Sequence, residues 1–279
     1  MTETTVVLHG ATGTQGRAIL RGLLTAGHHV RAVARNPVAH AAVQPFAADL
    51  LDVEALTAAY TGADAVVVQL PINFEDHAVR QTEAVLAALA KAGVRRAVFN
   101  TGGGLPPSSP IGVPFVDARV RLALELPNVV EHASVTGPAG PYLENLVAPW
   151  SVALIRDRGE LRYPIPASAP VPWLAAADLG TVIADLTLAA APAPACVVAG
   201  PVLLTGPELA AALSTAAGRE VRWQTIDPAE YAGMLAPHLG EATAAGIASV
   251  YTSPAPAPDP ATLTHGETTA AAWAAEQTF

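Results

Sequence analysis

A glycine-rich turn close to the amino terminus is the part of the sequence best suited to bind a phosphate. Gly10, Gly13 and Gly16 occur in HGATGTQG, between a β-branched apolar run and a helical pattern. Glycines at this spacing let the backbone turn tightly and approach a pyrophosphate, which the free N–H groups and the dipole of a helix amino terminus attract. The alternative is a turn that is only structural. The pattern favours dinucleotide binding, with further donors in the turn from Thr12, Thr14 and Gln15.

The end of the second predicted strand decides which dinucleotide fits. An NAD site normally has an Asp or Glu there, against the ribose 2′-hydroxyl, but this sequence has no acid between Arg31 and Asp49. It has Arg35 and Asn36 instead, and a guanidinium can form a bidentate, charge-assisted contact with a 2′-phosphate. Arg17 is placed to assist, and the alternative for Arg35 is a solvated arginine at a strand end. We therefore expect NADP(H) to be preferred over NAD(H).

Other candidate cofactor contacts follow the predicted strands, at their carboxyl ends. Ligands of open α/β sheets bind in the crevice outside these ends. Asp49 and Leu50 follow the third strand and are placed to flank the adenine. The candidates after the fourth and fifth strands are Gln69, Leu70, Pro71, Thr101 and Gly102.

Candidate residues for the substrate side combine aromatic rings with a few polar groups. Such a lining suits a flat apolar molecule lying against a nicotinamide. The candidates for catalytic contacts are His77, Tyr142 and Asn145. Each has an alternative role: a surface position for the histidine, core packing for the tyrosine and a structural contact for the asparagine. The aromatic candidates are Phe74, Trp150, Tyr163 and Trp173.

Short β-branched runs alternate with longer helical patterns in the first half of the chain. This alternation is typical of βαβ units and a parallel sheet. Strands are expected over 4–10, 28–35, 45–49, 63–71, 95–103 and 128–138, and helices over 15–27, 53–60, 77–93 and 116–126. The order of elements predicts an α/β fold with a doubly wound, mostly parallel Rossmann sheet.

The pattern changes after about residue 155, where the Pro-rich stretch 162–173 is expected to be a loop or an edge hairpin. Helices are then expected over 175–191 and 206–218 and from Pro228 onward, with strands at 196–200 and 219–226. We therefore predict an NADP(H)-binding Rossmann core over 1–155. A smaller C-terminal α+β part over 156–279 is expected on the substrate side, packed on the core.

Composition limits the classes of function. The chain has 279 residues, 51% of them hydrophobic, without an apolar run long enough to span a bilayer and without a recognisable export signal. A net charge of −9 disfavours binding to nucleic acid or to an anionic membrane, since both need a basic surface. Cys196 is the only cysteine, and no cluster of His, Cys and carboxylates has metal-ligand spacing. We expect a cytoplasmic monomer or homodimer without a metal site, whose partner is a small hydrophobic substrate.

The chain resembles the NmrA-like branch of the atypical short-chain dehydrogenase/reductases over nearly its whole length. The similar segments are GATGTQG with VRAVARNP, AADLLDVEAL, GPYLENL, VPWLAAADLG and LTGPELAAALSTAAGREV. The resemblance implies NADP binding, either in a quinone or double-bond reductase or in a redox-sensing regulator that binds NADP without turnover. It also implies that the family's isolated helix lysine corresponds to Arg121, with Arg119 as the other register.

Proton donation is the step at which the sequence departs from the wider family. Short-chain dehydrogenases typically pair a Tyr with a Lys four residues later, and the Lys lowers the pKa of the Tyr so that it donates a proton. No Tyr-x-x-x-Lys occurs here, and Lys91 is the only lysine. The leading hypothesis is an NADPH-dependent oxidoreductase that reduces a small hydrophobic enone, quinone or carbonyl compound. The alternatives are a non-catalytic NADP(H)-binding redox sensor and a cofactor-bound enzyme of non-reductive chemistry.

Overall fold

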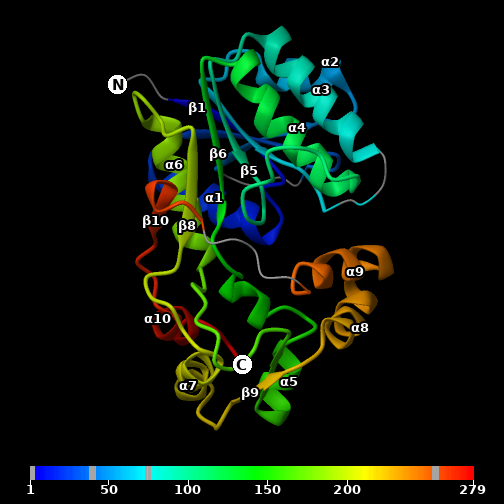
Figure 1. Ribbon diagram of the computed structural model, residues 1–279. Helices are drawn as coiled ribbons and strands as arrows, with labels where there is room; N and C mark the ends of the chain where they lie inside the picture. The colour runs from blue at the N-terminus through cyan, green and yellow to red at the C-terminus, as the bar shows by residue number, and fades with distance from the viewer. Residues whose placement is uncertain (1–3, 38–41, 73, 75–76, 253–257) are drawn as a thin grey trace. The chain divides into compact units, whose positions relative to one another are not determined.

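The computed structural model describes residues 4–37, 42–72, 74, 77–252 and 258–279 of the chain (Figure 1). Contacts between residues divide the chain into two compact units, 1–138 with 176–198 and 139–175 with 199–279. Each unit has a hydrophobic core of its own. The units differ from the expected consecutive parts 1–155 and 156–279, because residues 139–155 belong to the second unit and residues 176–198 to the first.

Seven strands of the first unit form a parallel sheet in the order β8-β6-β5-β4-β1-β2-β3. They are β1 Thr5–His9, β2 His29–Ala34, β3 Val43–Ala47, β4 Ala65–Gln69, β5 Arg96–Asn100, β6 His132–Pro138 and β8 Ala195–Ala199. The chain order reverses at β1, since β2 lies on one side of it and β4 on the other. This reversal is the hallmark of a doubly wound sheet. The predicted α/β fold with a mostly parallel Rossmann sheet is confirmed.

Helices cover both faces of this sheet (Figure 1). On one face lie α2 Val53–Tyr60, α3 His77–Ala92 and α4 Pro114–Val129, and on the other lie α1 Thr14–Thr25 and α6 Ala176–Leu188. Glycines let α1 and α6 approach closely, because a Cβ built on Gly22 would lie 2.4 Å from the Gly180 carbonyl oxygen. The sequence places α6 in the second part of the chain, but this contact with α1 makes it part of the first unit.

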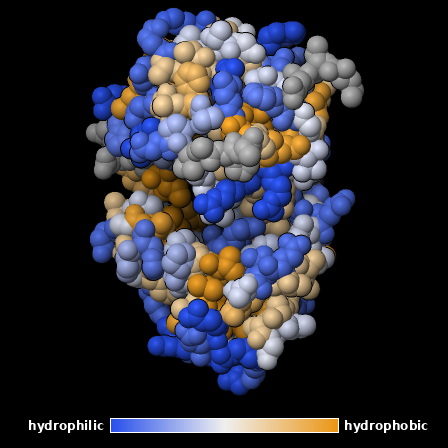
Figure 2. Space-filling view, turned by 180° about the vertical axis from the view of Figure 1, so that it is seen from behind, coloured by the Kyte–Doolittle hydropathy of each residue, from blue (hydrophilic) through white to orange (hydrophobic). Residues whose placement is uncertain are grey.

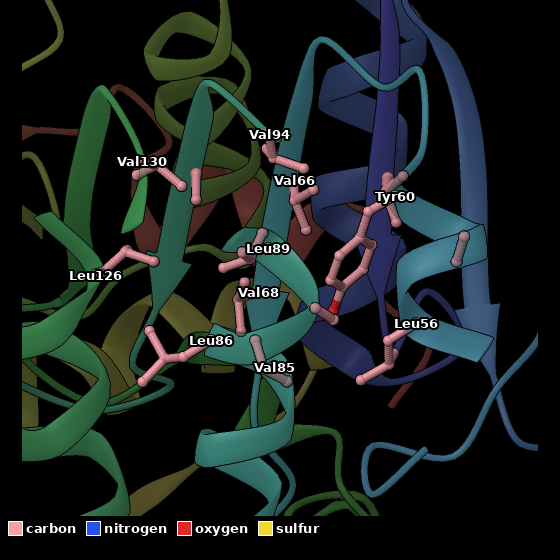
Figure 3. Packing of buried hydrophobic residues seen from close by; sticks show 14 of the residues in the cluster. Leu56, Tyr60, Val66, Val68, Val85, Leu86, Leu89, Val94, Leu126 and Val130 are labelled. Carbon is pink, nitrogen blue, oxygen red and sulfur yellow. The ribbon is translucent and has the colours of Figure 1, made fainter. Parts of the chain in front are cut away.

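The core on the face of α2, α3 and α4 is built mainly from aliphatic side chains (Figure 3). Val66 and Val68 of β4, Leu89 of α3 and Tyr60 of α2 belong to one buried cluster. Because β4 lies in the middle of the sheet, its residues 65–68 are all buried, as expected for a central parallel strand. Full burial of one Val or Leu side chain contributes about 1.5–3 kcal/mol. The cluster therefore fixes the strands whose carboxyl ends carry the candidate site.

A buried histidine ends β1, directly before the glycine-rich turn. His9 is 2% exposed, and its Nε2 lies 2.8 Å from the hydroxyl oxygen of Tyr60. The two rings are stacked with their centres 5.7 Å apart. Burial lowers the pKa of His9 to about 4, because a charged imidazole loses its hydration in the protein interior. The folded protein therefore keeps His9 neutral at physiological pH.

We expect acid to destabilise the protein through His9. Above about pH 6.5 the imidazole is neutral in both the folded and the unfolded state, so the free energy of unfolding is unaffected. At lower pH the unfolded chain binds a proton that the folded protein excludes, and stability falls by about 3 kcal/mol until about pH 4. Urea unfolding of the wild type and of His9→Gln, near neutral pH and at about pH 4.5, measures this loss. An equal loss in both proteins would contradict the prediction.

The second unit combines short helices with a two-stranded parallel sheet, as expected for an α+β part. Strand β7 Glu160–Tyr163 pairs with β9 Arg222–Thr225. The other elements are η1 Leu143–Leu146, α5 Val152–Arg158, α7 Gly206–Ala217, α8 Pro228–Leu239, α9 Glu241–Ser249, η2 Pro260–Thr262, β10 Leu263–His265 and α10 Ala270–Ala275. The Pro-rich stretch 162–173 is not a hairpin, because it begins in β7 and Val171 forms a bridge with Leu204.

Hydrophobic side chains also reach the surface. The face shown in Figure 2 carries hydrophobic patches among hydrophilic residues.

Among the residues that the structure describes, no helix combines the length and the apolar character needed to cross a membrane.

Candidate functional site

The glycine-rich turn forms a tight connection from β1 to α1. Gly10 has a positive φ of 61°, and its carbonyl oxygen accepts a hydrogen bond from the Gly13 amide at 3.1 Å. A Cβ on Gly16 would lie 1.9 Å from that same oxygen, so a side chain does not fit there. Helix α1 begins at Thr14, and the N–H groups of a first helical turn have no partner within the helix. The turn therefore offers amide donors to an anion.

Gly13 differs from Gly16 in what surrounds it. Its φ of −74° and ψ of 168° are open to any residue, and an added Cβ would meet the Gly10 carbonyl oxygen only at 3.5 Å. The protein itself thus leaves room for a side chain at Gly13. A glycine at this position lets a ligand approach the backbone closely, as a pyrophosphate does at such a turn. Pyrophosphate binding at Gly13 stays a prediction.

An amide network joins the glycine-rich turn to the carboxyl ends of β4 and β5. The buried Asn100 side chain, at the end of β5, donates to the side-chain oxygens of Gln15 at 2.8 Å and Gln69 at 3.1 Å. Gln69 donates in turn to the His9 carbonyl oxygen at 2.6 Å. The Gly102 amide donates to the Asn100 side-chain oxygen at 3.2 Å. Three predicted residues, Gln15, Gln69 and Gly102, are thus brought together around Asn100. Asn100 itself was not predicted, although a polar residue at the end of an apolar strand is a sequence signal for such a position.

A buried guanidinium holds the loops that follow β4 and β5. Arg119 of α4 is 6% exposed and donates to the carbonyl oxygens of Thr101 at 2.9 Å, Leu70 at 3.2 Å and Pro71 at 3.4 Å. Its Cζ lies 3.6 Å from the centre of the Phe115 ring. Burial lowers the pKa of Arg119 to about 9, which still leaves the group charged at neutral pH. Arg119 therefore positions the backbone of three predicted cofactor contacts.

Arg121 lies two residues further along α4 and has a different environment. Its guanidinium forms ion pairs with Glu83 and Glu125, the latter at 2.8 Å, and its side chain is 37% exposed. Residues two apart on a helix do not share a face, and of these two arginines it is Arg119 that contacts the loops. Cofactor binding by Arg121 stays a prediction. The contacts of Arg119 favour the alternative that Arg119, and not Arg121, occupies the position of the family's helix lysine.

The residues predicted to hold a 2′-phosphate lie on the surface of the first unit. Arg35 and Asn36 are exposed and directly follow β2. Thr12 is exposed as well, and its carbonyl oxygen accepts a hydrogen bond from Arg17 Nε at 2.8 Å. Thr12 and Arg17 line one hollow together with Ala34, the residue before Arg35. This arrangement is compatible with an anion beside Arg35, and the role of these residues stays a prediction.

The turn after β3 holds the two residues predicted to flank an adenine. Asp49 is exposed, and its carboxylate accepts a hydrogen bond from the Leu51 amide at 2.8 Å. Leu50 is half-buried and packs against the core cluster of Figure 3. Both residues are thus held by local contacts, and their contact with an adenine stays a prediction.

Tyr142 and Asn145 lie in the second unit and have contrasting surroundings. Tyr142 is 7% exposed, and its hydroxyl has no hydrogen-bond partner among the described residues. Burial, with a smaller contribution from the charge of Glu144, raises the pKa of Tyr142, so the phenol stays neutral. The Asn145 amide donates to the Tyr163 hydroxyl at 3.2 Å. Asn145 therefore has a structural contact, whereas Tyr142 keeps an unused donor.

Two of the predicted pocket aromatics belong to a core instead. Tyr163 is 0% and Trp173 2% exposed, and their ring centres lie 5.0 Å apart. Both pack with Tyr231 in the aromatic-rich cluster of the second unit. The prediction that Tyr163 and Trp173 line a substrate pocket is therefore corrected. The sequence did not indicate their burial, because a Pro-rich segment has no helical or strand periodicity.

The remaining candidates are partly buried. Phe74 of the first unit stacks on Phe115, with ring centres 4.7 Å apart. Trp150 of the second unit lies beside His238. His77 is half-buried where α3 begins. Its catalytic role stays a prediction.

Metal ligands do not gather in the described part of the chain, where no group of three His, Cys, Asp or Glu side chains could hold an ion. Cys196, in β8, is buried. The candidate site is built from backbone amides, side-chain amides and guanidinium groups.

Similarity to known proteins extends over most of the chain. The sequence model of the NmrA-like family matches residues 2–252. An NAD(P)H azoreductase from Xenophilus azovorans is 32% identical over 233 residues, which cover 79% of this chain and 77% of that protein. The crystal structure of an NADPH-dependent quinone oxidoreductase from Escherichia coli, complexed with NADPH, is 23% identical with a TM-score of 0.73, over 96% of this chain and 98% of the other. NmrA, a negative transcriptional regulator in complex with NADP, is 18% identical with a TM-score of 0.71, over 99% and 95% of the two chains.

Proposed function

Since the chain belongs to the NmrA-like family, we propose that it is an NADPH-dependent oxidoreductase. Its acceptor is a small hydrophobic molecule. A quinone or an enone, in which the carbonyl is conjugated, is preferred over a simple carbonyl compound. The observation that carries the proposal is Gly13, a glycine in the turn before α1 at which the protein itself leaves room for a side chain and a ligand can approach the backbone closely. The relatives named as an azoreductase and as a quinone oxidoreductase support the same class of reaction.

The residues of the first unit fit NADP(H). The pyrophosphate binds the amide donors of the turn around Gly13, at the amino end of α1. Arg35 pairs with the 2′-phosphate, with Thr12 and Arg17 beside it. No acid stands at the end of β2 to repel that phosphate or to bind a free 2′-hydroxyl. These contacts favour NADP(H) over NAD(H).

The bound cofactor supplies a hydride from its nicotinamide. The residues of the chain contribute orientation: Asn100 and Arg119 hold the backbone after β4 and β5 in one geometry, which limits reorganisation when ligands bind. Tyr142 is the candidate donor to the acceptor oxygen, because its hydroxyl is otherwise unused. It acts as a neutral hydrogen-bond donor, since its pKa is raised.

A non-catalytic NADP(H)-binding sensor is the second candidate. The missing Tyr-x-x-x-Lys and the structural likeness to NmrA, a negative transcriptional regulator, favour it. NADPH absorbance, followed with saturating protein and a soluble quinone, separates the two. The oxidoreductase consumes NADPH faster than the protein-free mixture. If no quinone or enone speeds the loss of NADPH while NADPH binds, the oxidoreductase proposal loses its main support and the sensor is preferred.

Arg35→Asp is expected to weaken NADPH binding while sparing or improving NADH binding. The substitution removes a charge-assisted contact and adds a like charge beside the 2′-phosphate, which together shift the preference by roughly 2–4 kcal/mol. Arg35 is exposed, so the fold should tolerate the change. Calorimetric titration of both proteins with NADPH and NADH measures the shift. Equal affinity of the wild type for the two cofactors would defeat the prediction.

A further inference from the structure

A small hollow opens on the second unit, where the turn after α5 meets the turn after α7. Its volume is about 250 Å³, and three of its five lining residues are arginines, Arg158, Arg219 and Arg222, the other two being Gly159 and Glu220. Backbone contacts hold the two turns together. The Arg222 amide donates to the Gly159 carbonyl oxygen at 2.8 Å, and a Cβ on Gly159 would lie 2.4 Å from the Glu220 carbonyl oxygen. The close approach of the two backbones therefore brings the three arginines together.

Positive charge exceeds negative charge around this arginine hollow. The segments 156–159 and 219–222 contain four arginines and two carboxylates. Asp157 accepts a hydrogen bond from Arg156 Nε at 2.6 Å. The Glu220 carboxylate pairs in the same way with the arginine that begins β9, at 2.6 Å. Each carboxylate is thus occupied by one arginine, and two positive charges remain in a chain whose net charge is −9.

The two arginines without a carboxylate are Arg158 and Arg219, and they differ in how they are held. Arg219 donates Nη1 to the Arg156 carbonyl oxygen in the last turn of α5. Arg158 is exposed and forms no hydrogen bond or ion pair with the residues that the structure describes. Both charges help to lower the pKa of Asp157, after the larger effect of its hydrogen bond to Arg156. Since Arg158 and Arg219 line one hollow and act on one carboxylate, they can also act together on one bound anion.

A structural role accounts for only part of this cluster. A cation in the last turn of a helix offsets the negative end of the helix dipole, and Arg219 does this for α5. Arg158 is not needed for that contact, and like charges held close together repel each other. An anion between the two groups removes this repulsion and gains charge-assisted hydrogen bonds.

The size and the chemistry of the arginine hollow limit what can bind there. A volume of about 250 Å³ is below the usual range for sites of drug-sized molecules, so a single small group fits better than a nucleotide. The planar fork of a guanidinium matches the oxygens of a phosphate bidentately. Two such forks suit a doubly charged phosphate better than a singly charged carboxylate.

We propose that the arginine hollow binds a phosphate group, either free inorganic phosphate or the phosphate of a small organic monoester. Arg158 and Arg219 bind its oxygens, while Arg222 stays paired with Glu220. The hollow lies wholly in the second unit, whereas Arg35 and the glycine-rich turn, which we propose for the dinucleotide, lie in the first. The proposal therefore does not depend on the oxidoreductase function.

Amide resonances of the ¹⁵N-labelled protein test this proposal, because one titration reports on both candidate phosphate sites. Inorganic phosphate, added at constant ionic strength, should shift the amide signals of Gly159 and Glu220 until they saturate. The amide signals of Gly13 and Gly16 report phosphate that binds at the dinucleotide turn. A parallel titration with phenyl phosphate distinguishes the two sources. Tighter binding than that of inorganic phosphate indicates the phosphate of a larger molecule, and equal or weaker binding indicates the free ion.

Arg158→Gln should weaken phosphate binding at the hollow about tenfold, as expected for the loss of one charge-assisted contact. Because Arg158 is exposed, the variant should fold, and its unchanged signals elsewhere in the spectrum would show this. The matched control is Arg80→Gln, which removes an exposed arginine of α3 in the first unit. This control should leave the phosphate affinity unchanged.

Three results would overturn the proposal. In the first, Arg158→Gln and Arg80→Gln change the phosphate affinity equally, so Arg158 has no role in binding. In the second, acetate at the same ionic strength shifts the Gly159 and Glu220 signals as phosphate does, so the hollow responds to any anion. In the third, phosphate shifts only the Gly13 and Gly16 signals, which assigns the ion to the dinucleotide turn. A protein that binds phosphate at the hollow as proposed but never consumes NADPH would refute the oxidoreductase and leave this proposal intact.

Discussion

Gly13→Val is expected to lower the affinity for NADPH by at least about 100-fold while the protein stays folded. The backbone at Gly13 has φ −74° and ψ 168°, a conformation that valine adopts readily. The nearest protein atom to an added Cβ is the Gly10 carbonyl oxygen, at an ordinary contact distance of 3.5 Å. An added Cβ therefore meets the protein only at an ordinary contact distance, and we expect the valine side chain to clash with the bound pyrophosphate. Calorimetric titration with NADPH and a thermal melt of each protein measure the two effects separately.

Gly16→Ala is the matched control within the same turn. Its Cβ would lie 1.9 Å from the Gly10 carbonyl oxygen, so the turn itself must shift and the melting temperature should fall. The two substitutions thus separate loss of the ligand site from loss of the fold. If Gly13→Val binds NADPH as tightly as the wild type, the turn is only structural and the proposed function loses its main support.

The strands and the doubly wound order could be predicted because each central strand is a short, unbroken apolar run. The buried residues 65–68 of β4 are an example. Which chain segments belong to each of the two units could not be predicted in the same way. Helix α6 follows the Pro-rich stretch but belongs to the first unit, held by the close approach of Gly22 and Gly180. This contact joins residues that are far apart in the chain. The sequence around each glycine gives no sign of it.

The candidate site could be predicted where backbone geometry demands particular residues. Gly10 and Gly16 are required by a positive φ and by a close approach. The choice between Arg119 and Arg121 depends instead on which face of α4 is buried. The resemblance first placed the family's lysine at Arg121. Arg119 shares a face with the buried Leu122 at i+3, and this spacing is a sequence signal that could have pointed to Arg119. For a long polar side chain such as arginine, the sequence alone does not otherwise show which way the side chain points.

Quinones and conjugated enones should be reduced by NADPH at least about 100-fold faster than unactivated ketones. A ketone needs a proton at the developing alkoxide, and a positioned acid accelerates that step by roughly 10²–10⁴-fold. The only lysine, Lys91, forms an ion pair with Glu54 at 2.5 Å, so no lysine activates a tyrosine here. A quinone or enone spreads the charge onto a conjugated oxygen, for which the neutral hydroxyl of Tyr142 or water is a sufficient donor.

Stopped-flow records of NADPH absorbance give kcat/KM for a panel of quinones, enones and ketones of similar size. Tyr142→Phe should lower kcat/KM for enones and leave NADPH affinity unchanged, since the buried hydroxyl has no partner in the described part of the chain. Removing it leaves no buried group unpaired, so the variant should melt at the wild-type temperature. Reduction of plain ketones at rates close to those of quinones would show that an efficient acid exists in this protein, and that acid would have to be sought outside the residues named here.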